Sequence, residues 1–362
     1  MTGRERLNSV LRKRPTDRLP WTTLVDERTL CLLPDELRAS SHIDFCRHLG
    51  CDMFMLNGWG TQHSLRSPEL RWSKSVETEL ERDDGRRTVR IRTPKGELTR
   101  VIEGTHPVKY AVDSIEAVHI YRDMWEGAMF TACDDTDSLA AIDEAIEDDG
   151  VVTRFWGPST IPRLLEEDMG TENFYYLMAD NPDEMHGLIQ TMHEREMDAF
   201  GILADGPWDS ITLCENTSTF YISPDIYKRY NMPHQRDFVT LAQDNNKVAI
   251  LHMCGHVRNI LDLIKETGCD GIHALTPEPT GDTPWEEALD VIGDDLIILG
   301  ILDPSVFISG PIEAIPAALD EMITPRLRES HFVLHPAADG IPVPLERFEA
   351  VKHWMDEKGI TT

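Results

Sequence analysis

Positive charge is scarce in this sequence. The 362 residues include 35 lysines and arginines against 64 aspartates and glutamates, a formal net charge of −29. Such an excess of negative charge repels phosphate backbones and anionic lipid surfaces over about a Debye length, ~8 Å at physiological salt. We therefore expect no nucleic-acid partner and no membrane partner. The acidity suits either a high-salt cytoplasm or an ordinary acidic cytosolic enzyme.

Long apolar segments and nucleotide-binding glycine patterns are also missing. No run reaches the ~18 apolar residues of a membrane-spanning helix, and the opening MTGRERLNSVLRKRPTDRLPW lacks the apolar stretch of a signal peptide. The sequence therefore predicts a cytoplasmic protein. Gly255 and Gly300 stand alone and form no dinucleotide or NTP fingerprint. The 7 cysteines are an odd number and widely spaced, which predicts free thiols that could serve as metal ligands.

Short apolar runs alternate with helical patterns along most of the chain. Eight such runs begin near residues 19, 51, 151, 209, 247, 270, 295 and 331. Eight strands alternating with helices are typical of a single (β/α)8 TIM barrel, whereas an open doubly wound α/β sheet has about 5 or 6. Between about residues 70 and 112, alternating polarity with turns at Asp83-Asp84-Gly85 and Pro94-Lys95-Gly96 predicts an inserted antiparallel meander. We therefore predict one α/β domain, residues 1–362.

Polar residues follow the apolar runs, where a TIM barrel places its active site. His252 and Cys254 stand two apart at the end of KVAIL, so both side chains can face the barrel mouth and bind zinc. A structural histidine and an inert buried cysteine are an equally weighted alternative. Asp339, Glu215 and His335 are candidates for a third ligand, and each could instead be structural, for example as a helix cap.

Further residues near the strand ends could contact a substrate. Aromatic side chains there could form pocket walls, although core packing is their more frequent use. We predict Glu215 and His252 as catalytic residues, and the predicted substrate contacts are Asn57, Tyr110, Trp156, Asn216 and Tyr221.

Several segments together resemble the uroporphyrinogen decarboxylase superfamily, in particular its zinc- and corrinoid-dependent methyltransferases. The resemblance rests on LHMCGHVRNILDLIKETGCDGIHAL, LIILGILDP and GIPVPLERFEAV. It extends to RERLNSVLRKRPTDRLPW, RTPKGELTR, HPVKY, GPSTIPRLLEEDMG and YISPDIYKRYNMPHQRDF, and so covers nearly the whole chain. In the methyltransferases a His-x-Cys pair and a later cysteine hold zinc. His252 and Cys254 match the pair, whereas Asp339 replaces the last cysteine.

The departures from the family bear on the reaction. True decarboxylases carry an arginine-bearing motif after the first strand, where this chain reads LVDERTLCLLPDELR. The resemblance therefore implies a methyltransferase with zinc at His252 and Cys254 and with Asp339 at the last ligand position, and we predict Glu215 as a further ligand. A carboxylate ligand makes zinc harder, which favours an oxygen-containing, methoxylated methyl donor. The methyl group would pass to a corrinoid (cobalamin) carried by a partner protein.

Two alternatives stay open. One is a metal-independent porphyrinogen decarboxylase in which Glu215 or Asp26 would interact with pyrrole nitrogens. The other is a catalytically idle barrel that binds a corrinoid or a partner protein, an idea motivated by the replacement at Asp339. The resemblance allows a homodimer, but no sequence feature requires one.

Overall fold

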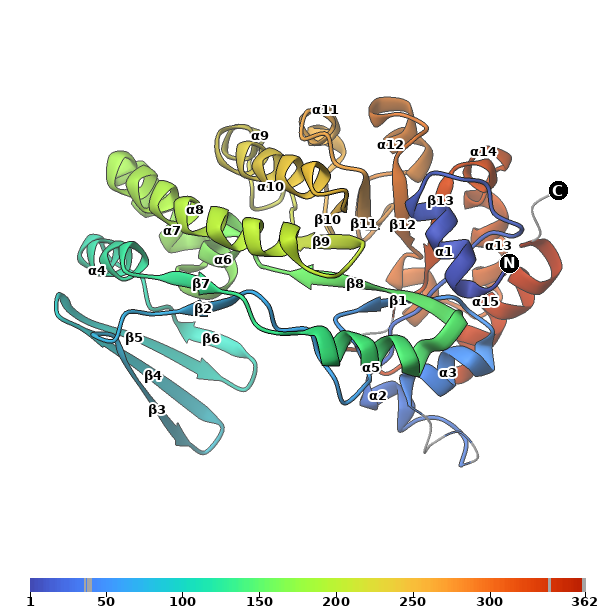
Figure 1. Ribbon diagram of the computed structural model, residues 1–362, viewed down its shortest axis with the longest axis horizontal. Coiled ribbons are helices and arrows are strands. Elements are labelled where there is room, and N and C mark those ends of the chain that lie inside the picture. The colour runs from blue at the N-terminus through green and yellow to red at the C-terminus, as the bar shows by residue number, and fades with distance from the viewer. Residues whose placement is uncertain (36, 38–40, 338–339, 360–362) are drawn as a thin grey trace.

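Seven parallel strands form a curled sheet in which neighbours along the chain are neighbours in space (Figure 1). The computed structural model describes residues 1–35, 37, 41–337 and 340–359. The strands are β1 (Met53–Leu56), β8 (Gly150–Trp156), β9 (Ser210–Cys214), β10 (Val248–His252), β11 (Gly271–Leu275), β12 (Ile297–Ile301) and β13 (His331–His335). This order, with helices between the strands, confirms the predicted α/β barrel.

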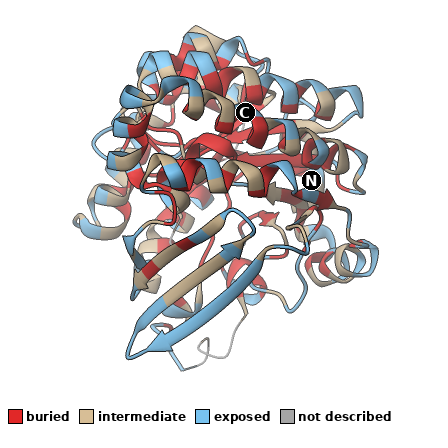
Figure 2. Cartoon of the chain, turned by 90° about the vertical axis from the view of Figure 1, so that its left-hand side faces the viewer, coloured by how far each residue is buried: buried red, intermediate tan, exposed pale blue. Residues whose placement is uncertain are grey.

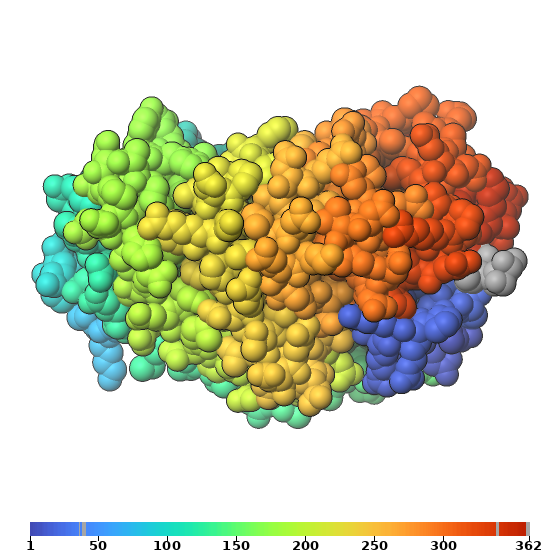
Figure 3. Space-filling view, turned by 90° about the horizontal axis from the view of Figure 1, so that it is seen from above, coloured from blue at the N-terminus to red at the C-terminus, as the bar shows by residue number. Residues whose placement is uncertain are grey.

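The predicted first strand, near residue 19, is extended but is not a regular strand. Trp21 forms an isolated parallel bridge with Leu334 on β13, and the Thr22 N–H donates to the Leu334 carbonyl. On its other side the Asp52 N–H donates to the Trp21 carbonyl, just before β1. Pro20 has no N–H to donate to a ladder. The segment therefore lies between β13 and β1. Figure 3 shows the amino-terminal part of the chain (blue) beside its carboxy-terminal part (orange to red).

Helices pack around the outside of this sheet (Figure 1). Along the barrel they are α1 (Gly3–Leu11), α2 (Glu27–Leu30), α3 (His42–Leu49), α4 (Ile115–Glu126), α5 (Thr136–Ile146), α6 (Thr160–Arg163), α7 (Gly170–Asp180), α8 (Pro182–Asp205), α9 (Pro224–Ile226), α10 (Met232–Asp244), α11 (Leu261–Lys265), α12 (Trp285–Ile292), α13 (Ala314–Met322), α14 (Pro325–Glu329) and α15 (Leu345–Lys358). Within the described residues no helix is both long and apolar enough to span a bilayer.

The predicted insertion is a four-stranded antiparallel sheet. Its strands β3 (Glu77–Asp83), β4 (Arg86–Thr93), β5 (Gly96–Glu103) and β6 (His106–Lys109) pair in chain order. Both predicted turns are present, between β3 and β4 and between β4 and β5. The sheet projects from one end of the molecule, and β3 is fully exposed (Figures 1 and 2). A short pair, β2 (Glu69–Arg71) with β7 (Met129–Thr131), runs beside it.

The barrel strands are buried on both faces, and their side chains alternate between two apolar clusters. The smaller cluster fills the barrel interior with strand residues such as Phe54, Ile250 and Val333. It also contains Leu7, Val10 and Leu11 of α1, which close the amino-terminal end of the barrel. The larger cluster lies between the outer faces of the strands and the helices. Since side chains along a strand alternate with period two, this arrangement decides which strand residues reach the barrel mouth.

Gly300 on β12 packs directly against the side-chain rings of Trp285 and Phe332. A Cβ at this position would lie 2.6 Å from ring atoms of both Trp285 and Phe332. Gly300→Ala is therefore expected to lower the free energy of unfolding by about 1–3 kcal/mol, the usual effect of overpacking a core. Denaturant unfolding measures this. Gly201→Ala in α8, where a Cβ would meet no atom within 4 Å, is the control and is expected to be neutral or slightly stabilising.

Asp168 makes stability depend on pH. Burial raises the pKa of this carboxyl to about 6, although the Arg163 guanidinium and a 2.6 Å hydrogen bond from the Tyr121 hydroxyl partly oppose the shift. The native state therefore binds more protons than the unfolded state between about pH 4 and pH 6, so stability falls as pH rises through that window. Relative to Asp168→Asn, the wild type should lose about 2–3 kcal/mol between pH 4 and pH 7. Denaturant unfolding measures this. If wild type and Asp168→Asn differ in unfolding free energy by the same amount at pH 4 and at pH 7, the prediction is wrong.

Candidate active site at the barrel mouth

The carboxyl ends of the strands open into a cavity of about 770 Å³. The inward-facing residues at these ends line it, because they continue the period-two pattern of the barrel interior. They are Leu56, Phe155, Cys214, His252, His273, Ile301 and His335, joined from the loops by Trp59, Asn216, Cys254 and Ala337. The structure thus places His252 and Cys254 on the wall of one cavity, as their spacing predicts.

Three histidines form a chain across the floor of this cavity. His252 and His273 occupy paired positions on β10 and β11, and their Nδ1 atoms lie 2.8 Å apart. Nε2 of His273 lies 3.3 Å from Nδ1 of His335. Burial lowers the pKa of His252 to about 4 and that of His335 to about 3. All three imidazoles are therefore neutral at pH 7, the protonation state that binds metals.

Two thiols lie beside this row of histidines and share one hydrogen-bond acceptor, the side-chain oxygen of Asn216. Cys214 occupies the β9 position paired with His252. The thiols of Cys214 and Cys254 donate to the same side-chain oxygen of Asn216, at 3.4 Å and 3.7 Å. The Asn216 amide donates to Glu166 at 3.1 Å. Asn216 has φ of 41°, a left-handed conformation that asparagine tolerates better than most residues. This turn after β9 positions the amide between the two thiols.

The other predicted metal ligands are Glu215, His335 and Asp339, and the structure does not place them together beside His252 and Cys254. Glu215 directly follows β9 and points toward α10, where its carboxylate accepts from Gln235 at 2.6 Å, and it is not part of the cavity wall. Burial raises the pKa of Glu215 to about 7. His335 contacts His273, and its Nε2 is buried without a partner among the described residues. Asp339 lies outside the described residues, so the structure does not place the predicted third ligand.

The predicted substrate contacts divide between the cavity and the core. Asn57 and Asn216 line the cavity. The side-chain oxygen of Asn57 accepts from Arg154 at 2.7 Å and from the Phe155 N–H at 2.9 Å, which ties β1 to β8.

The three predicted aromatic contacts lie outside the cavity wall. Trp156 faces the helices and packs edge-on against Phe130 and Phe200. Tyr110 lies against Gly170 at the start of α7. The Tyr221 hydroxyl donates to the Asn216 carbonyl and so supports the turn after β9 from behind.

Asp26, which the decarboxylase alternative singles out, caps a helix. Its carboxylate accepts from the Arg28 N–H at 2.9 Å at the start of α2 and from the Gly340 N–H at 3.0 Å. The second bond links the loop after the first extended segment to the loop after β13. Both bonds are structural, which matches the capping alternative considered for carboxylates at strand ends.

Cys214 and Phe155 are two cavity residues next to positions that the sequence predicts, and His273 is a third that it does not single out. Cys214 and Phe155 each lie one residue before a predicted one, Glu215 and Trp156. The signal that could have found them is the period of two, since Cys214 and Asn216 share a face just as His252 and Cys254 do. Glu166, which orients Asn216, comes from the segment between α6 and α7 and has no such signal.

Known proteins share this fold and parts of this sequence. A methylated-thiol–coenzyme M methyltransferase of Methanosarcina mazei is 28% identical over 162 residues, 44% of this chain and 40% of that protein. Methylcobamide:CoM methyltransferase MtaA of Methanosarcina barkeri is 30% identical over 138 residues, 38% of each chain. The chain thus spans about two fifths of the length of these curated relatives. A solved methyltransferase from M. mazei has a TM-score of 0.58 at 16% identity, with 99% of both chains covered, and so shares the fold.

One family model matches most of the barrel. It is described as uroporphyrinogen decarboxylase (URO-D) and matches residues 105–357, which include the His252-x-Cys254 strand end and all later strands. The match spans more than half of the chain, so this protein belongs to the uroporphyrinogen decarboxylase (URO-D) family.

Proposed function

We propose that this chain is a zinc-dependent methyltransferase that moves a methyl group between a small methoxylated compound and a corrinoid carried by a partner protein. The observation that carries the proposal is that His252 and Cys254 lie on the wall of one cavity at the barrel mouth. The similarity to methylcobamide:CoM and methylated-thiol–coenzyme M methyltransferases supports methyl transfer that involves a corrinoid.

The residues at the mouth fit zinc. Nδ1 of His252 is paired with His273, which leaves Nε2 for a metal, and the Cys254 thiol lines the same cavity. We propose Asp339 as the third ligand, with Cys214 as the competing donor because it lies beside Cys254 on the same Asn216 oxygen. One nitrogen, one sulfur and one further donor leave a fourth position open, as in catalytic zinc sites. Zinc bound there supplies a Lewis acid for the oxygen of the methyl donor.

The side chains around these donors hold them and exclude water. Asn216 accepts from both thiols and is itself held by Glu166, so one amide orients both thiols in the metal-free site. Phe155 packs edge-on against the His252 ring, 5.3 Å between ring centres, and covers it. Leu56, Ile301 and Ile308 make much of the remaining wall apolar. Such a lining suits an uncharged methoxylated compound. Glu215 does not line the cavity and accepts a hydrogen bond from Gln235 on α10. We propose that it is a positioning residue and does not itself contact the substrate.

Methyl transfer to free cobalamin tests the proposal. Zinc-loaded protein is mixed with cobalamin in the Co(I) state and a methoxylated aromatic compound, and methylcobalamin is followed by its absorption spectrum. We expect methylation that Cys254→Ser lowers by more than about 100-fold, because a metal ligand is lost. Cys31→Ser, at the exposed end of α2, is the matched control. If methoxylated, methylthiol and methylamine donors all fail with the zinc-loaded protein, the proposal is wrong.

The family name raises porphyrinogen decarboxylation as a second candidate. A porphyrinogen substrate carries several carboxylates, which need cationic partners in a binding site. The described residues that line the cavity include neither lysine nor arginine. We therefore expect uroporphyrinogen to keep all its carboxylates when incubated with the protein, and their loss would favour this second function over methyl transfer.

A further inference from the structure

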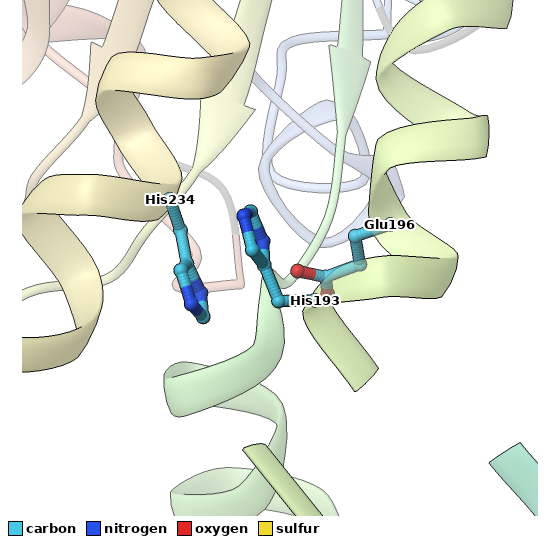
Figure 4. Close-up of side chains that lie close together, drawn as sticks. All are labelled: His193, Glu196 and His234. Atoms are coloured by element: carbon cyan, nitrogen blue, oxygen red, sulfur yellow. The ribbon is translucent and has the colours of Figure 1, made fainter. Parts of the chain in front are cut away.

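A second group of metal-binding side chains lies away from the mouth, between α8 and α10. His193 and Glu196 are three residues apart on α8, and His234 and Asp237 are three residues apart on α10. Side chains at this spacing share one face of a helix. The two helices pack against each other, so these faces meet (Figure 4). The figure shows the His193 ring between the His234 ring and the Glu196 carboxylate.

His193 and Glu196 are each held at one polar atom and leave another unpaired. The His193 Nε2 atom lies 2.8 Å from a carboxylate oxygen of Asp237, while its Nδ1 is buried without a hydrogen-bond partner in the described chain. One oxygen of Glu196 accepts from the Thr160 hydroxyl at 2.8 Å, and the other is also buried and unpaired among these residues. Glu196 is 1% exposed. Buried polar atoms almost always have partners, so two unpaired atoms in one cluster point to a missing ligand.

We propose that His193, Glu196 and His234 bind a divalent transition metal ion, Zn²⁺ in particular, between α8 and α10. Two imidazole nitrogens and one carboxylate oxygen form a ligand set that zinc accepts in proteins. Asp237 orients the His193 ring from its far nitrogen, as carboxylates commonly do for metal-bound histidines. The candidate donor atoms of the three residues all lie within 4.8 Å of one another.

A rotation of one ring completes the site. The His193 and His234 rings are stacked, 3.5 Å between centres and 2° between planes. Donor atoms around tetrahedral zinc lie about 3.4 Å apart, and both rings must point their nitrogens at the metal. Metal binding at this site therefore requires the His234 ring to rotate about its Cβ–Cγ bond, out of the stack, until one of its nitrogens faces the two unpaired atoms. Its side chain makes no hydrogen bond that would oppose the rotation, as far as the described residues show.

The proposed metal ties together elements behind the active site without belonging to it. Thr160, which donates to Glu196, begins α6 after β8. Gln235, next to His234, donates to Glu215 directly after β9. None of the three proposed ligands lines the cavity at the mouth. We therefore assign the metal a structural role: it fixes α8 to α10 and so supports the helices against which Glu215 packs.

Metal content in a protein without the mouth site tests this inference. The His252→Ala/Cys254→Ala double variant is purified without chelators, dialysed against zinc and then against buffer, and its zinc is measured by mass spectrometry. We expect about one equivalent to remain, bound by nitrogen and oxygen alone, so X-ray absorption should show no zinc–sulfur distance near ~2.3 Å. Adding Glu196→Gln should remove this equivalent. Adding Glu194→Gln, an exposed position on the same helix, should not.

A second variant keeps the test decisive if the buried substitution impairs folding. Asp237 is half exposed, so Asp237→Asn should fold and should weaken zinc binding by about 10–100-fold. Zinc should also raise the Tm of the double variant and not that of the triple variant with Glu196→Gln. A metal-free double variant, or a triple variant that keeps its zinc, would overturn the inference. If the protein proves to have no methyltransferase activity, the zinc ion between α8 and α10 should still be present. A failure of the proposed function can therefore be distinguished from a failure of this inference.

Discussion

His252→Ala is expected to abolish cysteine-bound metal and to lower methyl transfer by more than about 100-fold. The His252 imidazole is the nitrogen donor next to Cys254, and Nε2 is its only ring nitrogen that is not paired with His273. Without it the thiol and one further ligand would have to hold the ion, too few for a stable zinc site. Cobalt(II) substitution measures the effect, because only a cysteine-ligated cobalt ion shows sulfur-to-metal charge transfer in the near ultraviolet. That absorption band should disappear in the variant.

His48→Ala is the matched control for this substitution. His48 is an exposed histidine on α3, far from the strand ends. It should keep both the charge-transfer band and the activity. Retention of the band by His252→Ala would show that Cys254 binds metal with other partners, Cys214 being the nearest thiol. Unchanged activity together with a lost band would show that the mouth metal takes no part in the reaction.

Much of this site could be predicted because parallel barrel strands have a simple pattern. Their apolar runs are short, are bounded by turn residues and alternate with helices, so eight runs indicate eight barrel strands. His252 and Cys254 could be paired because residues two apart on an extended segment face the same side. The first extended segment, near residue 19, could also be located. Its irregularity fits Pro20, which has no N–H to donate. Its pairing with Leu334 depends on the closure of the whole barrel.

The predictions at Glu215 and Trp156 show what the pattern does not contain. Strands buried on both faces are apolar at most positions, so polarity alone does not reveal which residues face inward, and only the spacing of two from a residue already placed can do so. Cys214 and Phe155 were one residue away from the predicted positions and are the ones that line the cavity. The cluster between α8 and α10 was missed for a different reason. His193 and His234 come from helices separated by β9, and only packing brings their rings together.

The largest expected change in stability concerns the ion pair that attaches α1 to the barrel. The Arg6 guanidinium on α1 donates to Asp52, directly before β1, and to Asp17 at 2.8 Å. Asp52 is 2% exposed and Arg6 5% exposed. Burial raises the pKa of Asp52, while the charges of Arg18 and Arg6 act in the opposite direction. These two cations therefore favour the ionised form of the carboxyl, which burial disfavours.

Arg6→Met is expected to lower the free energy of unfolding by about 3–5 kcal/mol, because it leaves a buried carboxylate without its closest partner. Arg18, 3.3 Å from the same oxygen, compensates only in part because its own side chain is 30% exposed. Denaturant unfolding at pH 7 measures the loss. Arg12→Met, at the exposed carboxyl end of the same helix, should change stability by less than about 0.5 kcal/mol.

The double variant Arg6→Met/Asp52→Leu separates the ion pair from the packing of α1. If the loss in Arg6→Met comes from the uncompensated charge of Asp52, removing that charge as well should recover a large part of it, since apolar replacements of buried ion pairs are often nearly neutral. In this variant Asp17 keeps the N-terminal ammonium as its partner, and Arg18 keeps the Gly50 carbonyl. If the double variant is instead as unstable as the two single losses added together, the effect comes from displaced packing of Leu7, Val10 and Leu11 in the barrel end.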